Sequence, residues 1–179
     1  MCAIEYYTYE DYKNWEGRWE LIDGIPLAMA PAPLPTHQFI ALEISFHLRK
    51  QLENCPECVV LGEVDYKVNE DTVVRPDVVF TCEKLDKPYL TIAPEIIFEI
   101  ISPSSARRDE KFKFEIYEKE KVKYYVLVYP EDKKAKVYKN SKNRFEKEGD
   151  IVKTYEFNET KCKVAINFEE IFKRLSIIS

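Results

Sequence analysis

The segment EIIFEIIS, residues 95–102, constrains the fold most strongly because it is apolar on both of its alternating faces. Side chains alternate along a strand, so one face is wholly apolar, and the other carries Glu95 and Glu99 in alternation with Ile97 and Ile101. Strands that are apolar on both faces usually lie at the centre of a sheet. A second strongly apolar segment, KYYVLVYP at residues 123–130, follows after a helical pattern. We therefore expect an α/β fold, a sheet with helices packed on it.

Shorter patterns place the elements at the two ends of the chain. Thr8 and Asp11 form a variant capping box that starts a short helix. Asp23-Gly24 joins two alternating apolar runs and suits the primed turn of a hairpin. Short strands near the C-terminus end in a small helix, FEEIFKRL. We predict one domain over 1–179, with an N-terminal helix and hairpin in 1–35, the core in 36–130, and C-terminal hairpins and a short helix in 131–179.

Two helices and two further strands complete the predicted core. Thr36 is expected to cap a helix over residues 37–52. Its apolar stripe repeats every four positions and consists of Ile40, Ile44, Leu48 and Leu52. GEVDYKV, residues 62–68, and VVRPDVVF, residues 73–80, are predicted as strands. A second helix is predicted within residues 102–121.

Composition and charge restrict the compartment and the partners. Hydrophobic residues make up 45% of the chain and charged residues 33%, as in ordinary globular proteins. Charge interrupts every apolar run, and the acidic N-terminus lacks the basic head of a signal peptide, so we expect a cytoplasmic protein with no membrane partner. The net charge of -5 gives no support to a nucleic-acid partner, although ARRDEKFK, residues 106–113, is locally basic.

Two carboxylates stand in strongly apolar segments. Glu99 lies in the middle of the central strand, and Asp77 follows Pro76 inside VVRPDVVF. An unpaired buried charge costs several kcal/mol, so each acid needs a cation or must stay protonated. If the two strands are neighbours, both acids converge on one point. Such a pair can bind Mg²⁺, act as an acid/base dyad as in glycosidases, or form a structural ion pair with a lysine or arginine.

A lysine on the predicted second helix bears on this choice. Five side chains share about a third of a helical turn: Asp109, Phe112, Lys113, Ile116 and Tyr117. We expect Phe112 and Ile116 to face the sheet, so Lys113 flanks the buried stripe and can reach the two carboxylates. It would then be their structural partner, or it would position and activate a metal-bound water. Lys111 points elsewhere and is expected in solvent.

The cysteines offer a separate hypothesis. The chain has five, an odd number, and in a reducing compartment we do not expect a disulfide framework. Cys55 and Cys58 form a C-x-x-C that could be half a zinc site or a redox pair. Cys82 and Cys162 are the remaining distant partners, and there is no second C-x-x-C. We therefore favour an ordinary loop.

A family resemblance emerges from several segments together: WELIDG, THQFI, RPDVVF, EIIFEIISPSSARRDEKFKFEIY and YYVLVYP. From about residue 6 to the C-terminus, the chain resembles the Uma-type restriction endonuclease family of the PD-(D/E)xK nuclease superfamily. The resemblance implies a restriction-endonuclease-like core, a mixed central β-sheet flanked by helices. Asp77 matches the PD aspartate and Glu99 the second acid. The superfamily's usual lysine position is occupied by Ile101, and Lys113 on the following helix matches the family's relocated lysine.

The resemblance also draws attention to residues outside this trio. Glu20 in WELIDG matches a family position, either as a further acidic ligand or as a plain hairpin residue. His37 matches a family histidine, although a first-turn histidine is more often a surface or capping residue. Arg107 and Arg108 precede the helix and either contact a nucleic-acid backbone or lie in water.

Three more acids have a weaker connection to the site. Glu63 and Asp65 share a face of GEVDYKV and could point to the same site, but we favour the solvated side of an edge strand. Asp109 is expected to pair with Arg108 or Lys113.

The leading hypothesis is metal-dependent phosphodiester hydrolysis. Asp77 and Glu99 would hold one Mg²⁺ or Mn²⁺ as the catalytic ion, and Lys113 would orient water or neutralise developing charge. The resemblance implies DNA as substrate, without excluding RNA, and a homodimer. The principal alternative, which the acidic net charge favours, is a nuclease fold retained as a non-catalytic binding or assembly module. A glycosidase lacks an aromatic substrate platform near the pair and leaves Lys113 without a role.

Overall fold

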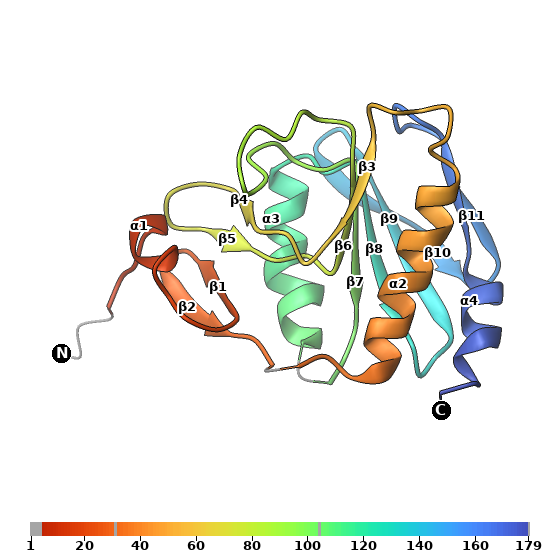
Figure 1. Cartoon of the computed structure of the whole chain (residues 1–179), viewed down its shortest axis with the longest axis horizontal. Coiled ribbons are helices and arrows are strands. Elements are labelled where there is room, and N and C mark those ends of the chain that lie inside the picture. The colour runs from red at the N-terminus through yellow and green to blue at the C-terminus, as the bar shows by residue number, and fades with distance from the viewer. Residues whose placement is uncertain (1–4, 31, 104, 179) are drawn as a thin grey trace.

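A six-stranded sheet runs through the centre of the molecule, in the order β10-β9-β8-β7-β6-β3 (Figure 1). The computed structural model describes residues 5–30, 32–103 and 105–178, so Cys2, and Ser104 of the S-P-S segment, lie outside the described residues. The strands are β3 (Val59–Gly62), β6 (Val78–Thr81), β7 (Ile96–Ile100), β8 (Tyr124–Tyr129), β9 (Lys134–Ser141) and β10 (Arg144–Ile151). β7 and β8 are parallel and the other neighbouring pairs are antiparallel. The predicted class, a mixed central sheet flanked by helices, is confirmed.

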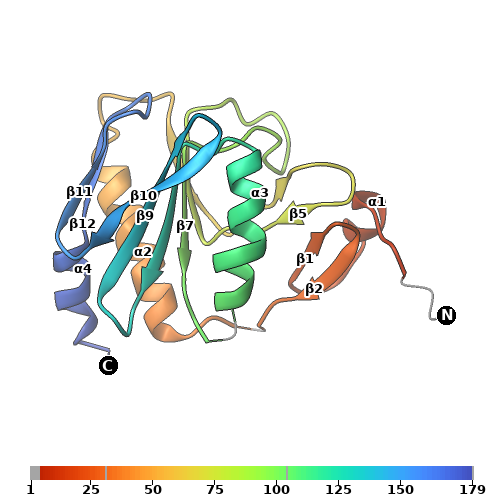
Figure 2. The same ribbon diagram turned by 180° about the vertical axis from the view of Figure 1, so that it is seen from behind.

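The doubly apolar strand β7 lies inside this sheet, as predicted, between β6 and β8. One of its faces packs into the larger hydrophobic cluster, together with α2 (Pro35–Lys50) and α4 (Phe168–Leu175). The other face packs with α3 (Phe114–Lys119) and β8. The two views of the molecule show helices covering both faces of the sheet (Figures 1 and 2). The burial of both faces explains why this strand is almost wholly apolar.

Helix α2 shows the predicted apolar stripe. Ile40, Ile44 and Leu48 are buried on the face toward the sheet. The helix begins at Pro35 with Leu34 as N-cap, so the prediction that Thr36 caps it is wrong. Proline has a fixed φ and needs no N–H partner, so it suits the first helical position and moves Thr36 into the first turn.

The segment VVRPDVVF is not one strand, contrary to prediction. Its first part is β5 (Val73–Val74), which belongs to a separate four-stranded sheet of order β2-β1-β5-β4, and its last part is β6 in the main sheet. Arg75, Pro76 and Asp77 form the connection between the two sheets. Pro76 has no N–H to donate to a strand ladder. At this crossing between the two sheets, no ladder needs a donor at its position.

The segment GEVDYKV is divided in the same way. Gly62 ends β3 in the main sheet, and β4 (Tyr66–Lys67) belongs to the smaller sheet. Glu63, between them, has a positive φ of 48°, which breaks the strand conformation. The smaller sheet also holds the predicted hairpin of β1 (Trp19–Ile22) and β2 (Ile25–Ala28). Its turn has φ of 49° at Asp23 and 74° at Gly24, as a primed turn requires.

Both ends of the chain form the predicted elements. The short helix α1 (Tyr9–Tyr12) has its capping box, in which the backbone N of Thr8 donates to Oδ2 of Asp11 at 2.9 Å. At the other end, the hairpin of β11 (Thr154–Phe157) and β12 (Val164–Asn167) leads into α4. This hairpin and α4 lie against α2 (Figure 1). Within the described residues, no helix combines the length and the hydropathy needed to cross a membrane.

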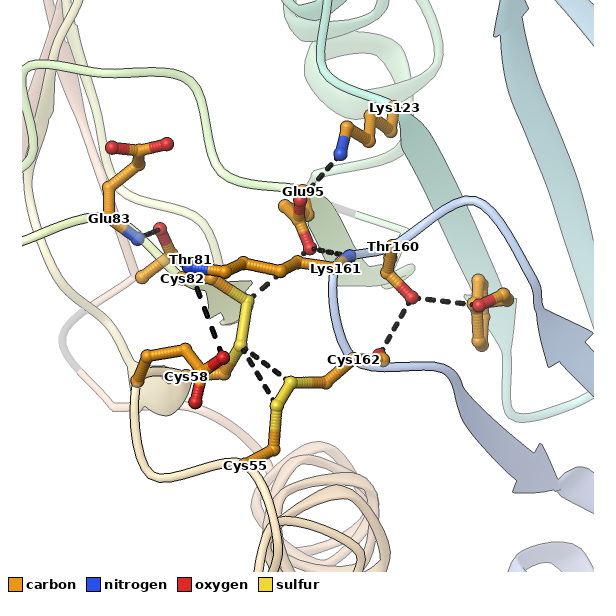
Figure 3. Close-up of a disulfide and its surroundings, with 12 residues drawn as sticks. Cys55, Cys58, Thr81, Cys82, Glu83, Glu95, Lys123, Thr160, Lys161 and Cys162 are labelled. Atoms are coloured by element: carbon orange, nitrogen blue, oxygen red, sulfur yellow. Dashed lines mark hydrogen bonds and ion pairs between the residues drawn. A yellow bond between two sulfur atoms is a disulfide. The ribbon is translucent and has the colours of Figure 1, made fainter.

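The cysteines do not sit in an ordinary loop. The structure brings Cys82 and Cys162 to the C-x-x-C segment and joins Cys55 to Cys162 and Cys58 to Cys82 (Figure 3). The expectation of a loop without disulfides is therefore wrong. Its failure has a tertiary cause, because the β11–β12 hairpin returns beside the C-terminal end of α2. There, the side chain of Gln51 bonds to the backbone N and O of Ala165, both at 2.8 Å.

Candidate active site

Pairing of β6 with β7 brings the two predicted acids to one place. Val78 lies opposite Phe98 in this antiparallel pair, so the register carried one step further places Asp77 opposite Glu99. Oδ2 of Asp77 also accepts a hydrogen bond from the backbone N of Ile100 at 2.6 Å, which holds the end of β6 against β7. Both carboxylates line a cavity of about 560 Å³.

Lys113 reaches this cavity from the other side. Its ammonium group lies 2.9 Å from Oε1 of Glu99, 2.8 Å from Oε1 of Glu20 and 3.4 Å from Oδ1 of Asp109. The side chain of Lys113 is only 3% exposed, so these contacts form with little competition from water. The structure therefore joins Lys113 to the second acid, and it also makes the expected pair with Asp109.

A π-helical turn sets which residues of this helix face the sheet. It is η1 (Arg108–Lys113), which runs directly into α3. Residues at intervals of four are buried along it, Asp109, Lys113 and Tyr117, whereas Phe112 is 38% exposed. The prediction that Phe112 faces the sheet is therefore wrong. A π turn closes its hydrogen bonds over five residues rather than four, so it winds more loosely than an α-helix and carries Phe112, three residues after Asp109, further from the buried face.

Glu20 is fully buried behind Lys113, so it is not a plain hairpin residue. Besides the lysine, it accepts a hydrogen bond from the backbone N of Arg75 at 2.8 Å and from Nη1 of Arg108 at 2.9 Å. Arg108 also lines the cavity and donates to the backbone O of Ala28 at 3.3 Å. Glu20 thus links the small sheet to the helix that carries Lys113.

Burial and crowding change the titration of these groups in opposite directions. Burial raises the pKa of Glu99 well above its ordinary value, and the nearby carboxylates of Asp109, Asp77 and Glu20 raise it further, against the opposing effect of Lys113. Burial alone would lower the pKa of Lys113, but its carboxylate neighbours outweigh it and hold this pKa well above normal. Lys113 therefore stays charged, and Glu99 readily holds a proton in the absence of a further cation.

The pKa values of Glu20 and Asp109 also depart from normal. Burial opposes ionisation of Glu20, but the charge of Lys113 and its hydrogen bond outweigh burial and lower the pKa. Burial raises the pKa of Asp109, and Lys113 and a hydrogen bond from Ser105 reduce this effect. The pKa values of the two acids next to Lys113 are thus shifted in opposite directions. The shift favours the carboxylate form of Glu20 and the protonated form of Asp109.

His37 is placed against Asp77 rather than at the surface. Its Nε2 lies 3.0 Å from Oδ2 of Asp77, and both residues line the cavity. Burial would lower the pKa of His37, but the hydrogen bond and the charge of Asp77 outweigh it and raise this pKa. Nδ1 is buried and has no hydrogen-bond partner among the described residues.

The other predicted residues lie outside this cluster. Arg107 is exposed, with its guanidinium 5.9 Å from the ring centroid of Phe112. Oε1 of Glu63, at the edge strand β3, pairs with Arg18 at 2.6 Å. Oδ1 of Asp65 pairs with Nε of Arg75 at 2.7 Å. Neither acid lines the cavity that Asp77 and Glu99 share.

Tyr117 is the contact that the sequence did not identify. Its hydroxyl donates to Oε1 of Glu99 at 3.0 Å, and its side chain is fully buried. The interval of four from Lys113 was a usable signal, since both residues contact the same carboxylate. An aromatic residue on a buried helical stripe is usually a core residue, so the stripe alone gives no indication that the hydroxyl of Tyr117 has a polar partner.

The donor set fits a hard divalent cation. Hydrogen bonds and ion pairs between described residues and the two acids use one oxygen of each, Oε1 of Glu99 and Oδ2 of Asp77. Both carboxylates also line the cavity, where they can bind a ligand. Mg²⁺ prefers such oxygen ligands. Four buried acids, Glu20, Asp77, Glu99 and Asp109, also exceed the two permanently charged cations of the cluster, Lys113 and Arg108.

A mixed sheet with helices on both faces, and a buried carboxylate–lysine cluster at the end of its inner strands, define the fold and the candidate site of this α/β protein. The chain belongs to the family described as "Putative restriction endonuclease", whose sequence profile matches residues 5–160. This confirms the resemblance seen in the sequence.

A solved structure shares the fold. It is a protein of Anabaena variabilis described as "a putative nuclease", which superposes with a TM-score of 0.77 at 16% sequence identity. The match covers 94% of this chain and 98% of the other. At this identity, the likeness shows the fold alone. Among curated proteins, none matches the chain.

Proposed function

We propose that the cavity shared by Asp77 and Glu99 is the active site of a Mg²⁺-dependent nuclease that hydrolyses phosphodiester bonds in DNA. Membership of a restriction endonuclease family supports this reaction class. The observation that carries the proposal is the buried ion pair of 2.9 Å between Lys113 and Glu99, beside the cavity that Asp77 also lines. The ends of β6 and β7 and the turn η1 each bring a charged side chain to this point, which an ordinary hydrophobic core does not require.

In this proposal, Asp77 and Glu99 hold Mg²⁺, or Mn²⁺ in its place, through their carboxylate oxygens. The bound ion would lower the pKa of a water and stabilise charge on the scissile phosphate. His37 holds Asp77 in position through Nε2, and Tyr117 does the same for Glu99. Both acids are thus oriented by neighbours, as metal ligands in proteins generally are.

Lys113 acts electrostatically in the same proposal. Its raised pKa keeps it an ammonium ion, so it does not accept a proton from water. Its charge orients Glu99 and offsets negative charge that develops at the phosphate. Arg108 is already engaged by Glu20, which leaves the exposed Arg107 as the better candidate for contacts to a nucleic-acid backbone.

A second candidate function is a non-catalytic binding or assembly module. The specific observation in its favour is that Lys113 and Arg108 already pair with buried acids, as in a structural ion-pair network. The net charge of -5 points the same way. Cleavage separates the two functions, because only the nuclease hydrolyses phosphodiester bonds when Mg²⁺ or Mn²⁺ is added.

Purified protein should nick plasmid or single-stranded DNA with Mg²⁺ or Mn²⁺, and the Asp77→Asn and Glu99→Gln variants should each lose at least about 100-fold in rate. RNA of the same sequence is run alongside to decide the substrate. Lys111→Met serves as the control, since Lys111 is exposed on the same helix, and it should cleave as wild type does.

Equal traces of nicked product from wild type and both acid variants would indicate a contaminating nuclease and reject the proposal. Calorimetric titration with Mn²⁺ completes the test. Binding without cleavage, lost in Glu99→Gln, would favour the binding module, whereas cleavage that depends on both acids supports the nuclease.

A further inference from the structure

Four of the five cysteines of the chain come together at one point (Figure 3). Cys55 and Cys58 lie in the turns that follow α2, with the backbone N of Cys58 donating to the O of Cys55 at 3.1 Å. Cys82 directly follows β6, and Cys162 lies in the loop between β11 and β12. Three segments that are distant in the sequence thus each direct sulfur to the same place.

The sulfurs of Cys55, Cys58 and Cys162 lie within 4.8 Å of one another, and Cys82 joins this group through its bridge to Cys58. Cys55 is joined to Cys162 and Cys58 to Cys82, but sulfurs of different pairs are also in contact. Sγ of Cys58 lies 3.2 Å from that of Cys162 and 3.8 Å from that of Cys55. Four thiolates around a tetrahedral Zn²⁺, with bonds of about 2.3 Å, have their sulfurs about 3.8 Å apart.

We propose that these four cysteines, when reduced, bind one Zn²⁺ as a structural site. A thiol or phosphine reductant supplies two electrons to each disulfide, and two protons from solvent complete two thiols. As each Zn–S bond forms, the thiol releases its proton to solvent. Four sulfur ligands close the coordination shell, as in structural zinc sites, and the C-x-x-C supplies the usual chelating pair.

The surroundings hold these ligands in place. The hydroxyl of Thr160 lies 2.7 Å from the backbone O of Phe157 and 2.8 Å from that of Cys162, which fixes the loop that carries the last ligand. Oε2 of Glu95 lies 3.4 Å from Sγ of Cys82 and accepts a hydrogen bond from the backbone N of Lys161 at 2.9 Å. Cys58 and Cys162 are buried, so little water competes for the ion.

The proposed zinc site is separate from the candidate active site. Asp77 precedes β6 and Cys82 follows it, so the two sites lie at opposite ends of this strand, roughly 17 Å apart for five extended residues. The zinc would join the C-terminal hairpin to the core and take no part in phosphodiester chemistry. Its presence does not depend on the nuclease proposal.

The experiment measures the metal in the full chain. Protein expressed with zinc and purified with a phosphine reductant should contain about one zinc per chain by elemental mass spectrometry. Substitution by Co²⁺ should give the absorption of a tetrahedral tetrathiolate centre. Cys82→Ser and Cys162→Ser should lose the metal at least tenfold. Cys2→Ser is the matched control and should keep it.

Alkylation of wild type gives a readout that does not require the variants to fold. In the folded, reduced protein, one cysteine should react quickly, and four more should react once a chelator removes the metal. Reduced protein that is purified without zinc, with all five thiols reactive before any chelator is added, overturns the proposal, as does iron in place of zinc or full zinc content in Cys162→Ser. Two disulfides that persist under the reductant also overturn it.

Discussion

Lys113 carries a full charge where almost no water reaches it. Three carboxylates surround its ammonium group, and the backbone O of Arg75 lies 3.5 Å away. A buried charge of this kind persists because its partners are buried with it and favour the ionised form. The same residue therefore favours the ionised forms of Glu99 and Glu20 against the effect of burial on their pKa values.

Replacement of this lysine should destabilise the fold. Lys113→Met leaves the carboxylate of Glu99 buried without its cation and leaves Glu20 with Arg108 alone, which should lower the free energy of unfolding at pH 7 by about 3–5 kcal/mol. Urea unfolding of wild type and variant measures the difference. Lys111→Met, two residues earlier and exposed, should leave the unfolding midpoint unchanged.

The loss in Lys113→Met should depend on pH. Burial and neighbouring acids already raise the pKa of Glu99, and removal of the lysine raises it further. An acid with a raised pKa in the folded state binds more protons there, so its contribution to stability is present at low pH and is lost as the pH rises through that pKa. The variant should be more stable at pH 5 than at pH 8, relative to wild type. A constant difference would contradict this explanation.

At the scale of an element, the π-helical turn determines the face that the helix presents. It aligns Asp109 and Lys113 with Tyr117 in α3, and the hydroxyl of Tyr125 in β8 donates to the backbone O of Asp109 at 2.9 Å. Phe112 points toward solvent, and Phe114 packs against the hydrophobic cluster in its place. The ring of Phe114 packs against Tyr138 and Phe145, with centroids 4.9 and 5.1 Å apart.

Two phenylalanines on one turn therefore provide a test of this register. Phe114→Ala should lower the free energy of unfolding by about 2–4 kcal/mol, since it removes ring contacts to three aromatic residues. Phe112→Ala should change it by less than about 0.5 kcal/mol, as for other exposed positions. Chemical denaturation of both variants measures these values. A larger loss of stability in Phe112→Ala than in Phe114→Ala would instead support the regular α-helical register predicted from the sequence.

At the scale of the whole molecule, the chain crosses from one sheet to the other at the candidate site. The chain passes from the small sheet to the main sheet through Arg75, Pro76 and Asp77. Glu20 on β1 and Asp77 at the start of β6 therefore come from different sheets, yet both lie around Lys113 and Glu99. A change in the packing of one sheet on the other would alter the site directly.

The homodimer implied by the family resemblance is the last prediction. Light scattering coupled to size exclusion should give twice the chain mass of 21.2 kDa. In the aromatic N-terminal segment, Tyr12 is buried in the chain's own core, whereas Tyr6 is 62% exposed and offers surface for a dimer contact. Tyr6→Ala should therefore leave the fold intact, and its effect on the measured mass tests whether this end of the chain takes part. A mass of one chain at micromolar concentration would reject the dimer.

Local sequence patterns were enough to predict the class of fold and the three central members of the cluster, Asp77, Glu99 and Lys113. Alternating apolar strands and a four-residue helical stripe are local patterns, and burial follows from them directly. Glu99 in an apolar strand needed a partner, which limited the choice to nearby basic residues such as Lys113. The family resemblance supplied Glu20 and His37, whose environments no local pattern shows.

Only the tertiary structure decided where strands end and which distant groups meet. Asp77 lies at a crossing between two sheets, and sheet membership depends on pairing partners rather than on the strand's own residues. The π turn rotates Phe112 outward through a packing preference that residue periodicity does not encode. Cys162 reaches Cys55 across 107 positions because a hairpin folds back on α2. Contacts of this kind arise from the packing of whole elements, so they appear only when the chain is folded.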